Sequence, residues 1–185
     1  GCTVPISVVS ESYNENIVSE DSVFELDIDT SFNFLMVGQF TGSAPENDRK
    51  NLFYTIKWIC EEFKDDKDVG IIFKTNSGRG TRIDRNLTRR KIQQVVEEVR
   101  SGPYPKIHLI HGNLTSSEIA SIYRNPKCKC LVSATRGEGF GLPLLDSAVA
   151  GLPVIATNWS GHLDFLGKGK FIPLNYSLSE VPRNR

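Results

Sequence analysis

Apolar residues in this chain fall into short continuous runs and into longer stretches with helical spacing. The continuous runs predict five buried strands, and a sixth short strand is expected around Phe171 and Ile172. The longer stretches predict amphipathic helices between the strands. The expected strands are 32–37, 68–74, 106–111, 129–133 and 153–157, and the expected helices are 46–63, 83–100, 115–123 and 142–149.

Strands and helices therefore alternate along the chain, which predicts right-handed crossovers and a parallel sheet. We expect an α/β fold, namely a doubly wound Rossmann-like sheet with helices on both faces. Ligands of such sheets bind beyond the carboxyl ends of the strands. The loops expected at that edge are 38–40, 76–78, 111–113, 134–140 and 157–161.

Composition narrows the class of protein. A length of 185 residues suits one domain, and 22 basic against 22 acidic residues give a formal net charge of zero. A nucleic-acid binder usually has a basic excess, so that class is disfavoured. No apolar run reaches the ~20 residues of a transmembrane helix, and the first residues lack a signal-peptide pattern. We expect a cytoplasmic protein.

The cysteines and histidines do not form a metal pattern. Cys128 and Cys130 have no second pair at zinc-binding spacing, so the four cysteines are expected to be free thiols of a reducing compartment. His111 and His162 are expected to be structural hydrogen-bonding residues, although either could be a pH-sensitive ligand. Neither a metal nor a cofactor is expected.

The most informative stretch is 136–157, which places Glu138 and Asp146 around a glycine-rich turn that opens a helix. Such a turn directs backbone N–H groups and the positive end of a helix dipole at its ligand, which favours an anion or a hydroxyl-rich group. From the residues alone, an ordinary strand–turn–helix connection with Glu138 as a helix-start acid also fits.

The run Glu138-Gly-Phe-Gly-Leu-Pro-Leu-Leu-Asp146 resembles the signature of retaining nucleotide-sugar glycosyltransferases with the GT-B fold, in particular glycosyltransferase family 4 (group 1). The family's second acid is usually Glu, and here it is Asp. Residues 4–15 resemble the link between the two halves of such an enzyme. The resemblance implies a linker and lead-in over 1–30 and a C-terminal-type, nucleotide-sugar-binding domain over 31–185. The partner would be an N-terminal acceptor-binding domain that this chain lacks.

The resemblance also implies roles for single residues. Glu138, the catalytic candidate, would accept hydrogen bonds from the donor sugar, and Asp146 would hold the ribose. Asn113 and Leu114 lie where the family reads the base through backbone groups. Lys50 matches the family's diphosphate-binding lysine. The implied donor-binding set is Gly38, Gln39, Lys50, Asn113, Leu114, Gly139, Phe140, Gly141, Leu142 and Asp146.

One position departs from the family in a way that concerns charge. Gln39 stands where the family has a second diphosphate-binding cation, an arginine. Arg49 or Arg136 could supply the missing charge. With one cation fewer, the diphosphate would be bound more weakly.

The leading interpretation is the donor-binding domain of a retaining, hexosyltransferase-type enzyme of carbohydrate biosynthesis. The donor substrate would be a nucleoside diphosphate sugar such as a UDP-sugar, and the chain by itself would be inactive. A non-catalytic nucleotide- or sugar-phosphate-binding module is the alternative. An epimerase that shares the GT-B fold is a third reading, and the residues around Glu138 argue against it.

Overall fold

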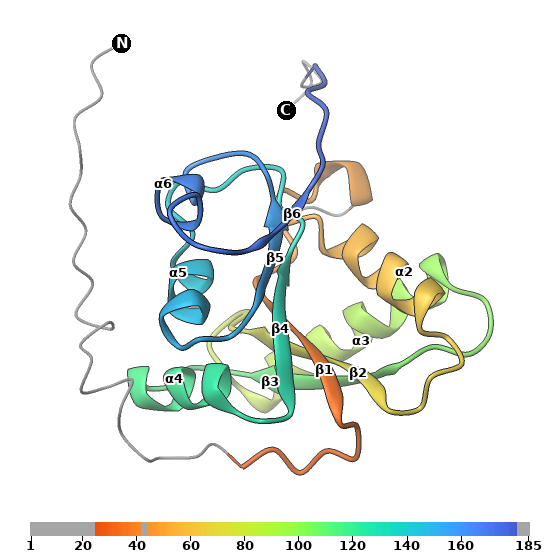
Figure 1. Ribbon diagram of the computed structural model, residues 1–185. Coiled ribbons are helices and arrows are strands. Elements are labelled where there is room, and N and C mark those ends of the chain that lie inside the picture. Colours follow the sequence, from red (N-terminus) through yellow and green to blue (C-terminus); the bar gives the residue numbers. More distant parts are fainter. Residues whose placement is uncertain (1–24, 42–43, 181–185) are drawn as a thin grey trace.

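The computed structural model describes residues 25–41 and 44–180, and its core is one six-stranded parallel sheet (Figure 1). The strand order is β3-β2-β1-β4-β5-β6, and every neighbouring pair is parallel. Chain order reverses between β1 and β4, so a crevice is expected beyond their carboxyl ends. The strands are β1 Phe32–Val37, β2 Val69–Thr75, β3 Lys106–His111, β4 Cys128–Ser133, β5 Val154–Thr157 and β6 Ile172–Leu174.

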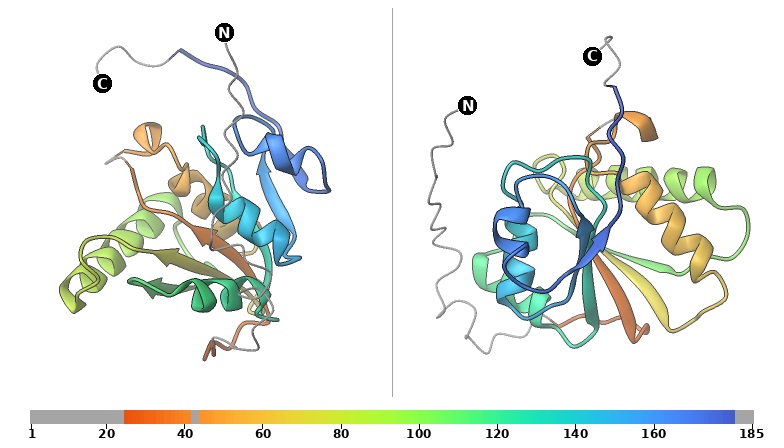
Figure 2. Two further views of the ribbon diagram at one scale, coloured as in Figure 1. Left: turned by 90° about the vertical axis from the view of Figure 1, so that its left-hand side faces the viewer. Right: turned by 45° about the horizontal axis from the view of Figure 1, so that its top comes forward.

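Helices cover both faces of the sheet (Figure 2), which confirms the predicted doubly wound α/β fold. Helices α2 (Leu52–Glu62) and α3 (Arg82–Val99) pack on one face, where Phe53, Ile56 and Val95 are among the buried residues. The other face is covered by α4 (Ser116–Arg124), α5 (Leu142–Val149) and α6 (Leu163–Leu166). Two apolar cores therefore sandwich the sheet and fix the loops at its carboxyl edge.

The predicted helix 46–63 is divided in the structure. Pro45–Asn47 form a 3₁₀ turn (η2), and α2 begins only at Leu52. The cause is the buried carboxylate of Asp48, whose Oδ2 accepts a hydrogen bond of 2.6 Å from the N–H of Leu52. A side chain that bonds to nearby backbone groups favours a turn over a continued helix.

The remaining elements lie within one or two residues of their expected bounds. The capping box at Thr115 and Glu118 is present, with the Thr115 side chain accepting from the N–H of Glu118. The strand expected around Phe171 is β6, and the four-residue helix α6 was not predicted. A helix of a single turn is too short for its apolar residues to show a recognisable helical spacing.

Three cysteines, Cys60, Cys128 and Cys130, are buried free thiols, and burial raises the pKa of each. Cys2 and most of the predicted linker 1–30 lie outside the described residues. Within the described part, Leu26 and Ile28 pack against the core on the α4–α6 face. None of the described helices has the length and apolar character needed to cross a bilayer.

Candidate functional site

The glycine-rich turn follows β4 and lies at the carboxyl edge of the sheet, beside the reversal of strand order. Gly141 ends the turn with φ 89° and is the N-cap of α5. A Cβ there would lie 2.9 Å from Leu144 Cδ1, so both backbone conformation and packing require glycine. Within the described parts of the chain, the N–H groups of Phe140 and Gly141 have no hydrogen-bond acceptor. They are suited to an anion at the helix N-terminus.

Glu138, in this turn, forms an ion pair with Lys50, and Arg49 Nη1 lies 3.6 Å from its Oε2. The Glu138 side chain is only 10% exposed, whereas that of Arg49 is 49% exposed. Arg49 Nη1 also donates to the carbonyl of Gly137 at 2.5 Å. The structure thus brings together Glu138 and Lys50, to which the family resemblance gives roles at the sugar and the diphosphate, and it places Arg49, one of the two possible substitutes for the missing arginine, beside them.

Asp48 holds the backbone of the loop that carries the two cations. Its Oδ1 accepts from the N–H of Lys50 at 3.2 Å and from the hydroxyl of Thr41 at 2.9 Å, and its Oδ2 accepts from the N–H of Leu52, the first residue of α2. Since Asp48 is fully buried, these bonds replace the water that the carboxylate loses. Sequence reasoning gave Asp48 no role, because an acid in the first turn of the predicted helix 46–63 looks like an ordinary surface residue.

Arg136, the other proposed substitute for the missing family arginine, is used within the loop. Its guanidinium donates to the carbonyl of Glu46 and to Asn51 Oδ1, and its N–H donates to the carbonyl of Arg49 at 2.9 Å. These bonds attach the β4–α5 turn to the β1–α2 loop. Arg49 is therefore the better candidate for the second cation.

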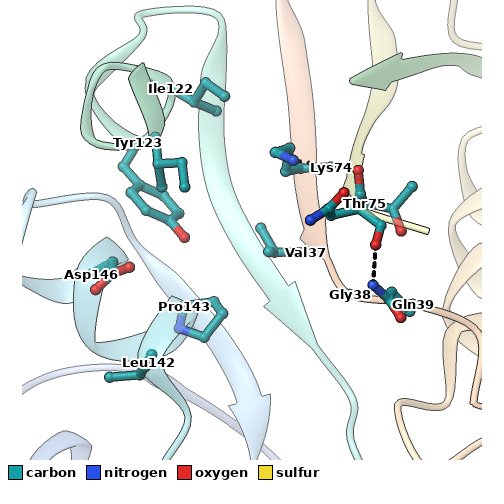
Figure 3. A pocket seen from close by; sticks show the side chains of 12 residues that line it. Val37, Gly38, Gln39, Lys74, Thr75, Ile122, Tyr123, Leu142, Pro143 and Asp146 are labelled. Atoms are coloured by element: carbon teal, nitrogen blue, oxygen red, sulfur yellow. Dashed lines mark hydrogen bonds between the residues drawn. The ribbon is translucent and has the colours of Figure 1, made fainter. Parts of the chain in front are cut away.

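Asp146 lines a cavity of about 270 Å³ at the crevice between β1 and β4, together with residues from β1, β2, α4 and α5 (Figure 3). Its Oδ1 is buried and has no hydrogen-bond partner in residues 25–41 and 44–180. Burial raises the pKa of Asp146 to about 7. A carboxylate that lacks donors inside a cavity is a candidate ligand-binding group.

The cavity adjoins the turn that carries Glu138. Val37 and Pro143 line both the Asp146 cavity and a smaller hollow bounded by Lys50 and Glu138. The two acids therefore line neighbouring hollows, and Glu138 is held by cations whereas Asp146 is not. One extended ligand could contact both.

The predicted base-reading loop lies at the same edge. Asn76 donates its side-chain amide to Asn113 Oδ1, and Gln39 donates its amide to the carbonyl of Asn76. Gly38 and Gln39 line the Asp146 cavity, whereas Leu114 packs against the adjacent core. These bonds connect the ends of β1, β2 and β3 across the cavity mouth.

Ser160 and Gly161 position the glycine-rich turn from the β5–α6 loop, a role that sequence reasoning missed. Ser160 Oγ accepts from the N–H of Glu138 at 2.8 Å, and the Gly161 N–H donates to the carbonyl of Glu138 at 3.1 Å. A Cβ on Gly161 would lie 1.9 Å from the carbonyl oxygen of Gly139. The only sequence signal was a glycine at the carboxyl edge of the sheet.

The two histidines at this edge lie apart from the cavity lining. His162 is fully buried, and its Nε2 lies 2.7 Å from the carbonyl oxygen of Thr157, which fits a structural role. Neither nitrogen of His111 has a partner among the described residues. No cluster of three or more His, Cys, Asp or Glu suited to a metal ion occurs within 25–41 and 44–180.

The model of the family described as glycosyl transferases group 1 matches residues 95–177, which include the glycine-rich turn and Asp146. A search of curated proteins found no match.

Among solved structures, the C-terminal domain of a group 1 glycosyl transferase from Francisella tularensis matches at 19% identity and TM-score 0.54, over 80% of this chain and 69% of that one. The UDP-forming α,α-trehalose-phosphate synthase from Burkholderia xenovorans, solved with glucose-6-phosphate, matches at 12% identity and TM-score 0.54 over 78% of this chain and 33% of that one. A trehalose-6-phosphate structure from E. coli, bound with UDP-2-fluoro glucose, matches at 10% identity and TM-score 0.53, over 79% of this chain and 33% of that one.

At these identities the structural likeness concerns the fold, and this chain spans about a third of the length of the two trehalose-phosphate chains. The described sheet has the Rossmann-like fold of a glycosyl transferase group 1 C-terminal domain, and residues 95–177 match the group 1 family itself.

Proposed function

We propose that this chain is the donor-binding domain of a retaining glycosyltransferase of family 4 type, which transfers a sugar from a nucleoside diphosphate sugar. One observation carries the proposal. A cavity with the unpartnered carboxylate of Asp146 adjoins the glycine-rich turn, where Arg49 and Lys50 meet Glu138. Hydroxyl-binding and anion-binding groups therefore lie side by side, as a nucleotide sugar requires.

The proposed ligand would extend from one hollow to the other. The ribose would donate its hydroxyls to Asp146, and the diphosphate would lie near the N-terminus of α5 and the two cations. The transferred sugar would then lie at Glu138. Lys50 would exchange part of its contact with Glu138 for a phosphate oxygen, so that the ion pair keeps the lysine near the site before the donor arrives.

The chemistry of transfer would depend on stabilising the leaving diphosphate. Preorganised cations and a helix N-terminus stabilise charge that develops as the bond to the sugar breaks. Lys50, Arg49 and the N–H groups of Phe140 and Gly141 are the groups of this chain that would do so. Glu138 would orient the sugar through its hydroxyls.

Transfer also needs a surface for the acceptor. The trehalose-phosphate chains are about three times as long as the matched region, which supports a second, acceptor-binding half outside this domain. We propose that the domain alone binds the donor and transfers no sugar. The buried free thiols fit a reducing, cytoplasmic compartment. A UDP-sugar donor is supported by the similar fold of the E. coli structure that is bound with UDP-2-fluoro glucose.

A non-catalytic nucleotide-binding module remains the second candidate, and Gln39 favours it. Its amide is occupied by the carbonyl of Asn76 and offers no charge to a diphosphate. In that case the site would bind the nucleoside diphosphate without holding a sugar at Glu138.

Titration calorimetry separates these roles through two substitutions. Asp146→Asn should weaken both nucleoside diphosphates and nucleotide sugars by about tenfold to a hundredfold, since a charge-assisted bond to the ribose is lost. Glu138→Gln should weaken only nucleotide sugars, and it should not weaken the plain diphosphate because the substitution frees Lys50. Asp164→Asn, an exposed acid on α6, is the matched control. The absence of binding by folded wild-type chain to UDP, GDP, ADP and CDP would refute the proposal.

A further inference from the structure

A buried lysine projects into the Asp146 cavity from the end of β2. Lys74 is 7% exposed, and it lies two residues after Ile72, which belongs to the core on the α4–α6 face. Because side chains alternate along a strand, Lys74 lies on that same face, where it lines the cavity. Figure 3 shows its ammonium across the cavity from Asp146.

The ammonium of Lys74 has no carboxylate partner among the described residues. Its Nζ donates to the carbonyl of Gly112 at 2.6 Å and to that of Thr75 at 3.3 Å. An ammonium has three N–H groups, so one donor remains for a ligand. Burial lowers the pKa of Lys74, because desolvation disfavours its charged form.

The position of Lys74 places it at the base end of a bound nucleotide. Its hydrogen-bond partner Gly112 immediately precedes Asn113, in the loop after β3. The cations Arg49 and Lys50 lie elsewhere, grouped with Glu138 beside the smaller hollow. A nucleotide with its diphosphate at those cations and its ribose at Asp146 would direct its base toward Lys74. This placement rests on the proposed function.

The chemistry of the two cavity walls matches a nucleoside. Asp146, when ionised, only accepts hydrogen bonds, and the ribose hydroxyls can donate them. Lys74 only donates, so the base must present an acceptor to it. Much of the remaining lining is apolar and suits a flat ring, with Val37, Ile119, Ile122 and Pro143 among the contributing residues.

We propose that Lys74 is a specificity-determining residue that donates a hydrogen bond to a ring carbonyl of the base. The site therefore selects nucleoside diphosphates with a keto group, as in uracil or guanine, over those with an amino group there, as in cytosine or adenine. An amino group would place a donor against a buried, charged donor and leave both without an acceptor, which is costly in a desolvated site.

Calorimetry on the wild-type chain tests the ranking first. UDP and CDP differ at C4 as carbonyl and amine, and N3 carries a proton only in UDP; inosine diphosphate and ADP differ in the same way at C6 and N1. We expect the tightest ligand to be a keto member, bound about ten to a hundred times more tightly than its amino counterpart. An amino member as the tightest ligand, or equal affinities within both pairs, would overturn the inference.

Lys74→Met then tests whether this side chain makes the distinction. The variant should lose about tenfold to a hundredfold in affinity for the keto ligand, while the amino ligand changes little and the discrimination disappears. Lys106→Met, at an exposed lysine on the neighbouring strand β3, should change neither affinity.

Two outcomes separate this inference from a structural role and from failure of the proposed function. If Lys74→Met weakens all four nucleotides by the same factor, Lys74 only holds the loop at Gly112, and the inference is wrong. If the wild-type chain binds no nucleoside diphosphate, the proposed function itself fails. If Lys74→Met does not fold, the wild-type ranking decides alone.

Discussion

At the scale of single residues, the raised pKa of Asp146 links the site to stability. The carboxyl titrates near 3.9 in an unfolded chain and, because it is buried, at about 7 in the folded one. Between these values the folded state binds a proton that the unfolded state has lost. Stability therefore falls as pH rises from about 4 through 7, and the full cost of the buried charge is present above 7.

Replacing Asp146 with Asn removes this cost. We expect Asp146→Asn to raise the melting temperature at pH 8 and to change it little at pH 4, where wild-type Asp146 is neutral in the folded state and only about half ionised in the unfolded state. Thermal denaturation followed by circular dichroism between pH 4 and pH 8 measures the difference. The same change in melting temperature at both ends of this range would show that Asp146 titrates normally.

Gln39 is the residue at which the family resemblance implies a missing positive charge. Gln39→Arg should tighten nucleoside diphosphate binding, because a guanidinium adds a full charge and a forked donor. The gain should shrink as salt rises, since ions screen exposed charges. It should also depend on Lys50, so Lys50→Ala should weaken binding with either residue at position 39.

Calorimetry at two salt concentrations, about 50 mM and 500 mM, measures the effect; the Debye length falls across this range. Lys106→Arg, which alters a cation away from the cavity, serves as the control. Equal affinities of wild type and Gln39→Arg at both concentrations would mean that residue 39 does not face the diphosphate.

At the scale of elements, the glycine-rich turn depends on the β5–α6 loop as much as on its own sequence. The backbone of Glu138 is held by Ser160 and Gly161, and Gly161 allows the two loops to approach within van der Waals distance. Ser160 adopts φ 98°, an unusual conformation for a residue with a side chain. The turn is thus positioned by contacts from a loop over twenty residues away.

Gly161→Ala should therefore displace the turn. A Cβ 1.9 Å from a backbone oxygen forces movement, and we expect a loss of about 1–3 kcal/mol in stability, as for other overpacked sites, together with weaker nucleotide-sugar binding. Chemical denaturation and calorimetry measure the two effects. Gly137→Ala is the matched control, because a Cβ at Gly137 has no neighbour within 4 Å. Equal behaviour of the two variants would contradict the positioning role of Gly161.

Elements were predictable from the sequence where their signal is local. Strands such as β2 contain a continuous buried apolar run, and helix α5 begins at the glycine-rich turn where expected. The break before α2 was not predictable from the spacing of apolar residues, because it comes from the hydrogen bonds of the Asp48 side chain. Lys74 escaped notice for a related reason, since a lysine near the end of an apolar strand normally marks the approach to solvent.

At the scale of the whole molecule, the reversal of strand order brings together residues that are far apart in sequence. Lys50 and Glu138 are 88 positions apart and form an ion pair, because β1 and β4 are neighbours. The family resemblance assigned both residues to one donor, and sequence spacing alone could not show that they touch. The site is a property of the parallel sheet, whose loops all converge at one edge.

The most direct measurement of the central claim is a nuclear magnetic resonance titration of the ¹⁵N-labelled chain with the tightest-binding nucleoside diphosphate. The account predicts that amide shifts change at 37–39, 49–51, 74–76, 112–114 and 138–146, all at the carboxyl edge of the sheet. The amide shifts of residues at the opposite edge of the sheet, such as Lys67, Lys106 and Lys129, should stay unchanged. Saturable shifts confined to that opposite edge, or no shifts at all in a folded sample, would contradict the account.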